Sequence, residues 1–242
     1  MINSSWPPLI AVIGSDGSGK STICKYLINE LRRYGPAMPV HLGKQAGNTG
    51  RALSALPLLG KPLKKAIVHN TKKIKSPQAN VSLLSALVIM AFVGRRLLRF
   101  RRMLKYRRKG YIVLTDRFPQ TQVPGGYDSP SFPEQITAGR VIQRMAEKER
   151  KLFAWMTLQQ PDMVIKLNVS LNIACQRKPD HSEEKLARKI AVTPQLTFSN
   201  AEVVDIDADQ PLNQVITLAG QAIGQFMERR GYCPPAGNAP RQ

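Results

Sequence analysis

The chain has 242 residues, a length that suits one α/β domain, and 43% of them are hydrophobic, which argues against extensive disorder. Lysine and arginine number 36 against 16 aspartates and glutamates, so the net charge of +20 implies an anionic partner. The three cysteines, Cys24, Cys175 and Cys233, have no paired or metal-like spacing. This argues against a disulfide scaffold or a zinc module and predicts a cytoplasmic protein.

Apolar runs typical of strands alternate along the chain with stretches whose apolar residues recur at helical spacing. In chain order we predict a strand at 9–13, a helix at 20–34, a strand at 40–42, a helix at 81–109, a strand at 111–115, a helix at 134–160, a strand at 163–169, a short helix at 171–177, a strand at 203–206 and a helix at 211–230. This alternation predicts an α/β fold with a mostly parallel sheet and helices on both faces. We expect a single domain over 1–230 and a disordered tail at 231–242.

The positive charge is concentrated in one third of the chain. Residues 31–115 contain 19 lysines and arginines and no acidic residue, whereas the remainder holds 17 basic and 16 acidic residues. Nine of the basic residues fall in Arg95–Lys109, directly after the apolar run Val81–Val93. That run is too short to span a membrane, which takes about 20 apolar residues.

Three interpretations of 81–109 stay open. The segment is a core helix whose second half emerges basic, an amphipathic helix on an anionic membrane surface or other polyanion, or a nucleic-acid-binding element. Nucleic acid is the least supported partner, because aromatic residues that could stack on bases are scarce near the basic run. Peripheral contact with an anionic membrane or polyanion through Arg95–Lys109 is therefore the main alternative to a structural helix.

A glycine-rich loop follows the first predicted strand. Residues 14–22, GSDGSGKST, fit the pattern G-x-x-x-x-G-K-[ST] and stand between a strand and an amphipathic helix. Glycines let the backbone curl until several N–H groups point at one anion, and the helix N-terminus adds positive partial charge. Lys20 can then reach the β- and γ-phosphates of ATP, and the Ser21 hydroxyl can bind Mg²⁺. The residues predicted to bind ATP here are Gly14, Ser15, Asp16, Gly17, Ser18, Gly19, Lys20, Ser21 and Thr22.

A second motif stands at the end of the predicted strand 111–115. Asp116 follows the strand directly, and Arg117 follows Asp116. Ligands of open α/β sheets bind at the carboxyl ends of the strands. We therefore predict that Asp116 binds Mg²⁺ or a water of its shell and that Arg117 binds a phosphate, with a strand-end ion pair as the alternative.

Four segments in order resemble the thymidylate kinase-like branch of the P-loop nucleoside and nucleotide kinases. They are GSDGSGKST at 14–22, VLTDRF at 113–118, PDMVIKLNVSLNIACQRK at 161–178 and EVVDIDADQPLNQV at 202–215. The resemblance implies a three-layer P-loop NTPase fold with a five-stranded parallel sheet. It also implies transfer of the γ-phosphoryl group of ATP to a nucleoside or nucleotide.

The resemblance assigns roles to further residues. Arg117 would contact the acceptor phosphate, Asp16 would lie near the acceptor or the metal, and Asp207 and Ala208 would lie near adenine. Arg177 and Arg188 would bracket a lid at 177–189. The residues support the lid independently, because this basic segment has few apolar anchors and could close over the transferring group. The alternative is a solvated helix face. The predicted catalytic residues are thus Lys20, Asp116, Arg117, Arg177 and Arg188.

The region 43–110 departs from the family, in which it helps to form the acceptor pocket. Here it is a long basic insertion, and the segment VHLGK at 40–44 lacks the carboxylate that serves hydroxyl kinases as a base. A phosphate acceptor needs no base, so we expect a nucleoside monophosphate or another small anionic acceptor. Asp16 and Asp116 stay open as alternative bases for a hydroxyl acceptor. The three histidines, His41, His69 and His181, show no metal-ligand spacing and are expected to be structural.

Three functions follow from these patterns. The first is an ATP- and Mg²⁺-dependent kinase resembling the nucleoside monophosphate kinases, with a homodimer as an open alternative to a monomer. The second is a nucleotide-binding regulatory or assembly protein that docks on an anionic surface. The third is a nucleic-acid-dependent ATPase, which we regard as the weakest, because no DNA-reading motif is visible.

Overall fold

The computed structural model of the chain describes residues 6–43, 81–136 and 138–234. They fall into two compact units, which are described separately. The sheet unit contains the described residues of 6–42, 99–118 and 160–234, and the helical unit contains those of 43, 81–98 and 119–159. Most of the predicted insertion at 43–110 and most of the predicted tail lie outside the described residues.

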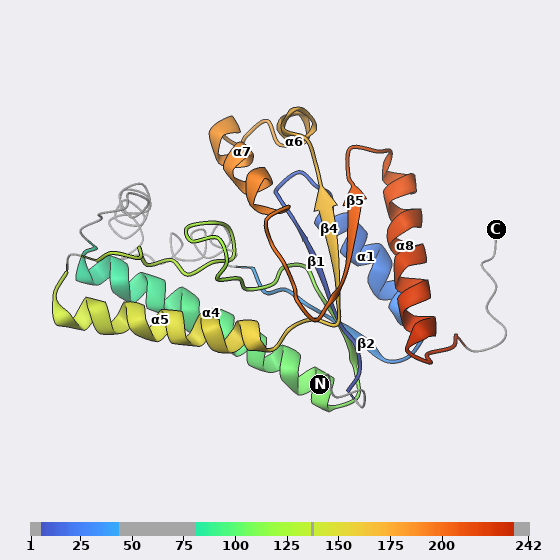
Figure 1. The fold of residues 1–242 in the computed structure, drawn as a ribbon, viewed down its shortest axis with the longest axis horizontal. Coiled ribbons are helices and arrows are strands. Elements are labelled where there is room, and N and C mark those ends of the chain that lie inside the picture. Colours follow the sequence, from blue (N-terminus) through green and yellow to red (C-terminus); the bar gives the residue numbers. More distant parts are fainter. Residues whose placement is uncertain (1–5, 44–80, 137, 235–242) are drawn as a thin grey trace, which may run out of the picture. The chain divides into compact units, whose positions relative to one another are not determined.

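The described residues contain a five-stranded parallel sheet with the strand order β2-β3-β1-β4-β5 (Figure 1). Its strands are β1 (Leu9–Gly14), β2 (Ala37–Val40), β3 (Ile112–Thr115), β4 (Met163–Asn168) and β5 (Glu202–Asp207). Each neighbouring pair is parallel. The carboxyl ends of all five strands therefore lie along one edge. The predicted α/β fold is confirmed.

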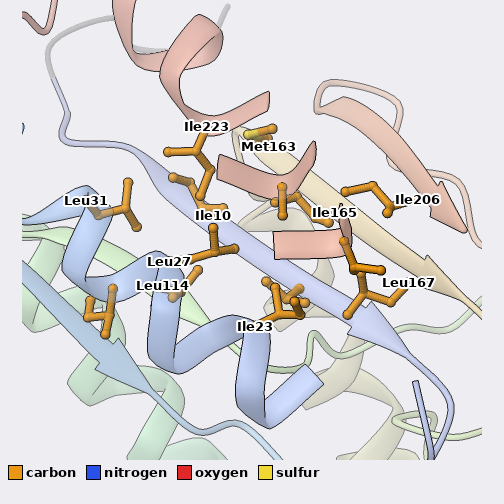
Figure 2. Packing of buried hydrophobic residues seen from close by; sticks show 14 of the residues in the cluster. Ile10, Ile23, Leu27, Leu31, Leu114, Met163, Ile165, Leu167, Ile206 and Ile223 are labelled. Carbon is orange, nitrogen blue, oxygen red and sulfur yellow. The ribbon is translucent and has the colours of Figure 1, made fainter. Parts of the chain in front are cut away.

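Helices cover the sheet because both of its faces are apolar. The sheet unit contains α1 (Lys20–Leu31), α6 (Leu171–Arg177), α7 (Glu183–Val192) and α8 (Leu212–Arg229). Figure 2 shows Leu27 of α1 and Ile223 of α8 packed around Ile10 of β1, on the face that also carries Ile165 of β4. Residues that alternate with these, such as Leu9, are also completely buried, so the opposite face is covered as well.

The remaining helices are α4 (Leu83–Arg108), which continues from the helical unit into the sheet unit, and α5 (Arg140–Leu158) in the helical unit. In the sheet unit α4 buries Phe100, Met103 and Leu104. Its outer side carries exposed basic residues, which are Arg95, Arg101, Arg102, Lys105 and Arg108. In the described part of the chain, no helix combines the length and hydropathy needed to cross a membrane.

Most elements begin and end within three residues of their predicted bounds, but three differences stand out. The helix predicted at 134–160 begins only at Arg140. The second strand was predicted at 40–42 but spans Ala37–Val40 and includes Pro39. As an edge strand β2 pairs only with β3, so a residue without an N–H is tolerated there. The charged stretch after residue 178 was predicted to be a solvated lid segment, with a solvated helix face as the alternative, and α7 forms there. It has Glu183 and Glu184 in its first turn, where the helix dipole favours acids, and it buries Leu186.

The helical unit is held together by a buried ion pair. Arg96 of α4, 3% exposed, donates from Nη2 to Asp128 Oδ1 at 2.7 Å and from Nη1 to the Asp128 carbonyl at 3.1 Å. Its guanidinium also lies 5.3 Å from the ring centroid of Phe153 in α5. Nearby, the completely buried Glu149 accepts hydrogen bonds from the amides of Ser131 and Phe132. These charges fix the loop 119–133 against the two helices.

We predict that Arg96→Ala destabilises the protein by about 3–5 kcal/mol, because it removes the guanidinium from a buried carboxylate. Urea unfolding measures the change. The control is Arg101→Ala on the exposed side of the same helix, for which a change below about 0.5 kcal/mol is expected. Equal losses in the two variants would contradict a structural role for the pair.

Candidate functional site

The glycine-rich loop curls between β1 and α1. Gly19 has φ +83° at the N-cap of α1, and Ser18 Oγ donates to the Ser15 carbonyl at 2.9 Å. Lys20 is 8% exposed, and its Nζ contacts the Ser15 carbonyl and lies 3.4 Å from Ser18 Oγ. The amine that was predicted to meet phosphates is thus bonded to its own loop in this structure.

Close packing beneath the loop requires glycine at two positions. A Cβ atom on Gly14 would lie 2.7 Å from the Leu167 carbonyl oxygen and 2.7 Å from Ser18 Oγ. A Cβ atom on Gly17 would lie 3.0 Å from Cα of Ala174 in α6. The loop is therefore wedged against β4 and α6, and this fixes its curvature.

Asp16, at the centre of the loop, is surrounded by cationic side chains. Arg117 Nη2, from the segment after β3, lies 3.3 Å from Asp16 Oδ1. Lys189 Nζ, from α7, contacts Asp16 Oδ2, and His181 Nδ1 lies 3.7 Å from the same oxygen. The Asp16 carboxylate is thus the anionic partner of Arg117 and Lys189, two side chains of the kind that bind phosphate in proteins.

The charges around Asp16 determine its ionisation. Burial raises the pKa of Asp16, but the hydrogen bond from Lys189 and the charges of Lys189, Arg117 and Lys20 outweigh burial and lower the pKa from 3.8 to about 2. Asp16 is therefore a carboxylate throughout the physiological range and balances part of the local positive charge.

Asp116 meets His41 because the two residues leave adjacent parallel strands together. Val40 of β2 is in register with Thr115 of β3, so the next residues stand side by side at the sheet edge. His41 Nδ1 contacts Asp116 Oδ2, and the Leu42 amide donates to Asp116 Oδ1 at 3.3 Å. Both oxygens of the predicted metal ligand therefore have protein donors.

A cavity of about 210 Å³ borders the glycine-rich loop. Ser18, Gly19 and Thr22 line one wall, and Arg177, Ala208 and Gln210 contribute to the other. Arg177 Nη1 donates to the carbonyls of Gly17 at 3.2 Å and Ala208 at 2.9 Å, so it joins the loop to the end of β5. Asp207 Oδ1 accepts from the Asp209 amide at 2.9 Å and shapes the same turn.

The other predicted residues occupy more peripheral positions. Ser21 and Thr22 are exposed in the first turn of α1. Arg188 pairs with Glu184 along α7, and its side chain is 67% exposed, whereas its neighbour Lys189 reaches the loop. The contact of Lys189 with Asp16 was not predicted, because the sequence does not determine which side chains of this basic segment point toward the loop.

The contacts of two histidines were not predicted either. His41 and His181 were expected to be structural, and they contact Asp116 and Asp16. His41 directly follows β2, and a polar residue at that position indicates a site residue. Because the strand was predicted at 40–42, His41 was placed inside the strand instead of after it. His69 lies outside the described residues.

We predict that Asp16→Asn destabilises the protein at neutral pH, because the surrounding cations lose their carboxylate. The pKa of Asp16 is depressed, so its contribution is complete above about 3.8 and is lost as the pH falls through about 2. The stability difference from the parent protein should therefore shrink between about pH 4 and pH 2 in urea unfolding. Asp180→Asn is the control, because its side chain is 78% exposed. A pH-independent difference for Asp16→Asn would contradict the prediction.

A scan against protein-family models finds no match. Two proteins of Escherichia coli strain K12 are clearly similar over nearly their whole length. The ATP-binding protein YghS is 36% identical over 228 residues, which cover 92% of this chain and 95% of YghS. The ATP-binding protein YghR is 32% identical over 219 residues, which cover 90% of this chain and 87% of YghR.

Among solved structures, deoxyadenosine kinase from M. mycoides with bound dCTP has a similar fold. The TM-score is 0.50 at 14% sequence identity, and the match covers 89% of this chain and 98% of the kinase. At this identity the likeness concerns the fold alone. The chain has the P-loop kinase fold, and it belongs to the family of the Escherichia coli proteins YghS and YghR.

Proposed function

We propose that this protein transfers the γ-phosphoryl group of ATP to a small nucleoside or nucleotide acceptor. The observation that carries the proposal is the curled loop with Lys20 at the start of α1 and Arg117 and Lys189 gathered around Asp16. The similarity to two ATP-binding relatives supports ATP as the phosphoryl donor.

The chemistry we propose depends on positioning and charge neutralisation. The loop amides and Lys20 would bind the polyphosphate, and Arg117 and Lys189 would exchange Asp16 for phosphate oxygens. Arg177 and Ala208 line the cavity of about 210 Å³, which we assign to adenine, whereas Asp207 shapes the turn that leads to Ala208 and lines a separate cavity beside Ser15. Arg188 would act only after a movement of α7, since its present partner is Glu184.

The residues fit a minimal Mg²⁺ site. Among the described residues no group of three or more His, Cys, Asp or Glu could hold a metal ion. Mg²⁺ in phosphoryl-transfer enzymes needs only one or two protein oxygens besides substrate phosphates and water, and the exposed Ser21 hydroxyl suits this. When bound, Mg²⁺ would neutralise phosphate charge. Asp116 already has His41 and Leu42 as partners, so we assign its role to the acceptor side.

The acceptor class follows from the residues after β2 and β3. The sequence favours a nucleoside monophosphate of the thymidylate kinase-like type, because no carboxylate follows β2. In the structure, however, the His41–Asp116 pair stands at that position. A nucleoside with a free hydroxyl therefore joins the monophosphates as a candidate acceptor.

We predict that Lys20→Ala lowers the rate of ATP-dependent acceptor phosphorylation by about 100-fold or more, because it removes the side-chain cation of the loop. ADP release is measured with a panel of nucleosides and nucleoside monophosphates. Lys25→Ala, exposed on the same helix, is the control that should retain activity. An ADP release rate that is unchanged in Lys20→Ala would overturn the proposed site.

A second candidate function is docking on an anionic surface through the exposed basic face of α4. Arg101, Lys105 and Arg108 recur at helical spacing on that face, in a segment without acidic residues. Each basic residue near an anionic membrane contributes about 1 kcal/mol to binding. We predict that changing all three to alanine weakens binding to phosphatidylserine-containing liposomes about 100-fold. Binding that neither weakens in the variant nor falls with added salt would exclude this function.

A further inference from the structure

The His41–Asp116 pair contains an unused hydrogen-bonding atom. His41 Nδ1 contacts the Asp116 carboxylate, whereas His41 Nε2 is buried and has no hydrogen-bond partner among the residues that the structure describes. A buried acceptor without a partner costs about 1–3 kcal/mol, and folded proteins keep few of them. An atom of this kind near a binding loop indicates a ligand group that completes it.

The Asp116 carboxylate determines which kind of ligand group can bind to His41 Nε2. An ionised carboxylate only accepts hydrogen bonds, so Nδ1 carries the proton of the imidazole. In the neutral ring Nε2 then presents a lone pair and can only accept. Phosphate oxygens, which are themselves acceptors, do not satisfy it, whereas a hydroxyl group does.

The pair also stands close to the predicted phosphate site. Asp116 is followed by Arg117, whose guanidinium lies 3.3 Å from Asp16 in the loop. β3, which leads to Asp116, pairs directly with β1, which leads to the loop. In the strand order β2-β3-β1, the residues after β3 thus lie between His41, which follows β2, and the loop, which follows β1.

We propose that His41 is a specificity-determining residue whose Nε2 accepts a hydrogen bond from a hydroxyl group of the phosphoryl acceptor. Asp116 is then a positioning residue, because it fixes the ring and the tautomer of His41. The inference rests on the proposed function and adds to it the class of acceptor group that is recognised. A sugar hydroxyl of a nucleoside or nucleotide fits this description.

The first test is a cycle that pairs a side-chain change with a substrate change. Initial rates are measured with ATP and acceptors that differ by one sugar hydroxyl, namely 2′-deoxyadenosine and thymidine, their 3′-deoxy analogues, and the corresponding monophosphates. The parent protein should prefer the hydroxyl-bearing acceptor about 10- to 100-fold in kcat/KM. In His41→Ala this preference should disappear, because the partner of the hydroxyl is gone.

Two further variants separate recognition from folding. His41→Gln offers an amide oxygen to the hydroxyl and should restore part of the preference. Asp116→Asn should lower the preference without removing the imidazole, because the tautomer is no longer fixed. Lys25→Ala is the control variant, and thermal unfolding shows which variants keep their fold. A purely structural role for His41 would slow both members of each acceptor pair equally.

The second test observes the atom directly. In ¹⁵N-histidine-labelled protein the His41 ring signals are assigned by their loss in His41→Gln. Nε2 should be unprotonated in the free protein, and its signal should shift when a hydroxyl-bearing acceptor binds. A protonated Nε2 in the free protein, or no shift at saturating acceptor, would overturn the inference.

The outcomes distinguish the inference from the function on which it rests. Equal preference in the parent and His41→Ala, with turnover intact and dependent on Lys20, overturns the role of His41 and leaves the kinase proposal standing. Absence of Lys20-dependent phosphorylation with every acceptor, together with an unshifted Nε2 signal, overturns both. Loss of the hydroxyl preference in His41→Ala, with the preference kept in the parent protein and in the control variant, supports both the role of His41 and the kinase proposal.

Discussion

The parallel alignment of all five strands is the constraint on which the site depends. Because every strand ends at the same edge, segments that are distant in sequence are delivered to one place. β1 supplies the curled loop, β3 supplies Asp116 and Arg117, and β2 supplies His41. The register of Val40 with Thr115 then decides that His41 and Asp116 meet rather than pass each other. An antiparallel β2 would have carried its carboxyl end to the opposite edge.

Charge at this edge is balanced within the protein. A loop that gathers Lys20, Arg117 and Lys189 would be strongly repulsive without a nearby anion, and Asp16 supplies one from inside the loop. The basic residues of α4 are of two kinds, those paired with a buried carboxylate and those exposed to solvent. Arg96 is neutralised by a buried carboxylate, whereas Arg101, Lys105 and Arg108 remain exposed on α4.

Patterns of hydropathy were sufficient to predict the class of fold and the order of the elements except α7, whose segment was predicted to be a lid with a helix face as the alternative. The position of the loop was also predictable from its glycine motif. Gly14 and Gly17 pack so closely against Leu167 and Ala174 that a larger residue would not fit, and this requirement is visible in the sequence. Contacts between side chains at strand ends were less predictable, since an error of two or three residues in a strand boundary conceals them. His41 was missed for this reason, and its significance depends on register with a strand about 75 residues further along.

The segment 177–189, which was predicted to be a lid, illustrates a different limit. Its composition indicated a solvated basic segment, but the helical phase of α7 decides that Lys189 contacts Asp16 while Arg188 pairs with Glu184. That phase depends on tertiary burial of Leu186, which local composition does not reveal. The likeness of the fold to that of deoxyadenosine kinase leaves such residue-level assignments open, because sites differ among proteins that share a fold.

The self-bonded state of Lys20 has a consequence for how the loop would bind an anion. Its amine is already held by the Ser15 carbonyl, and Asp16 already engages the surrounding cations. If ATP binds here as we propose, its linked phosphates have enough oxygens to take over these contacts in turn, so that the cations exchange one anionic partner for another.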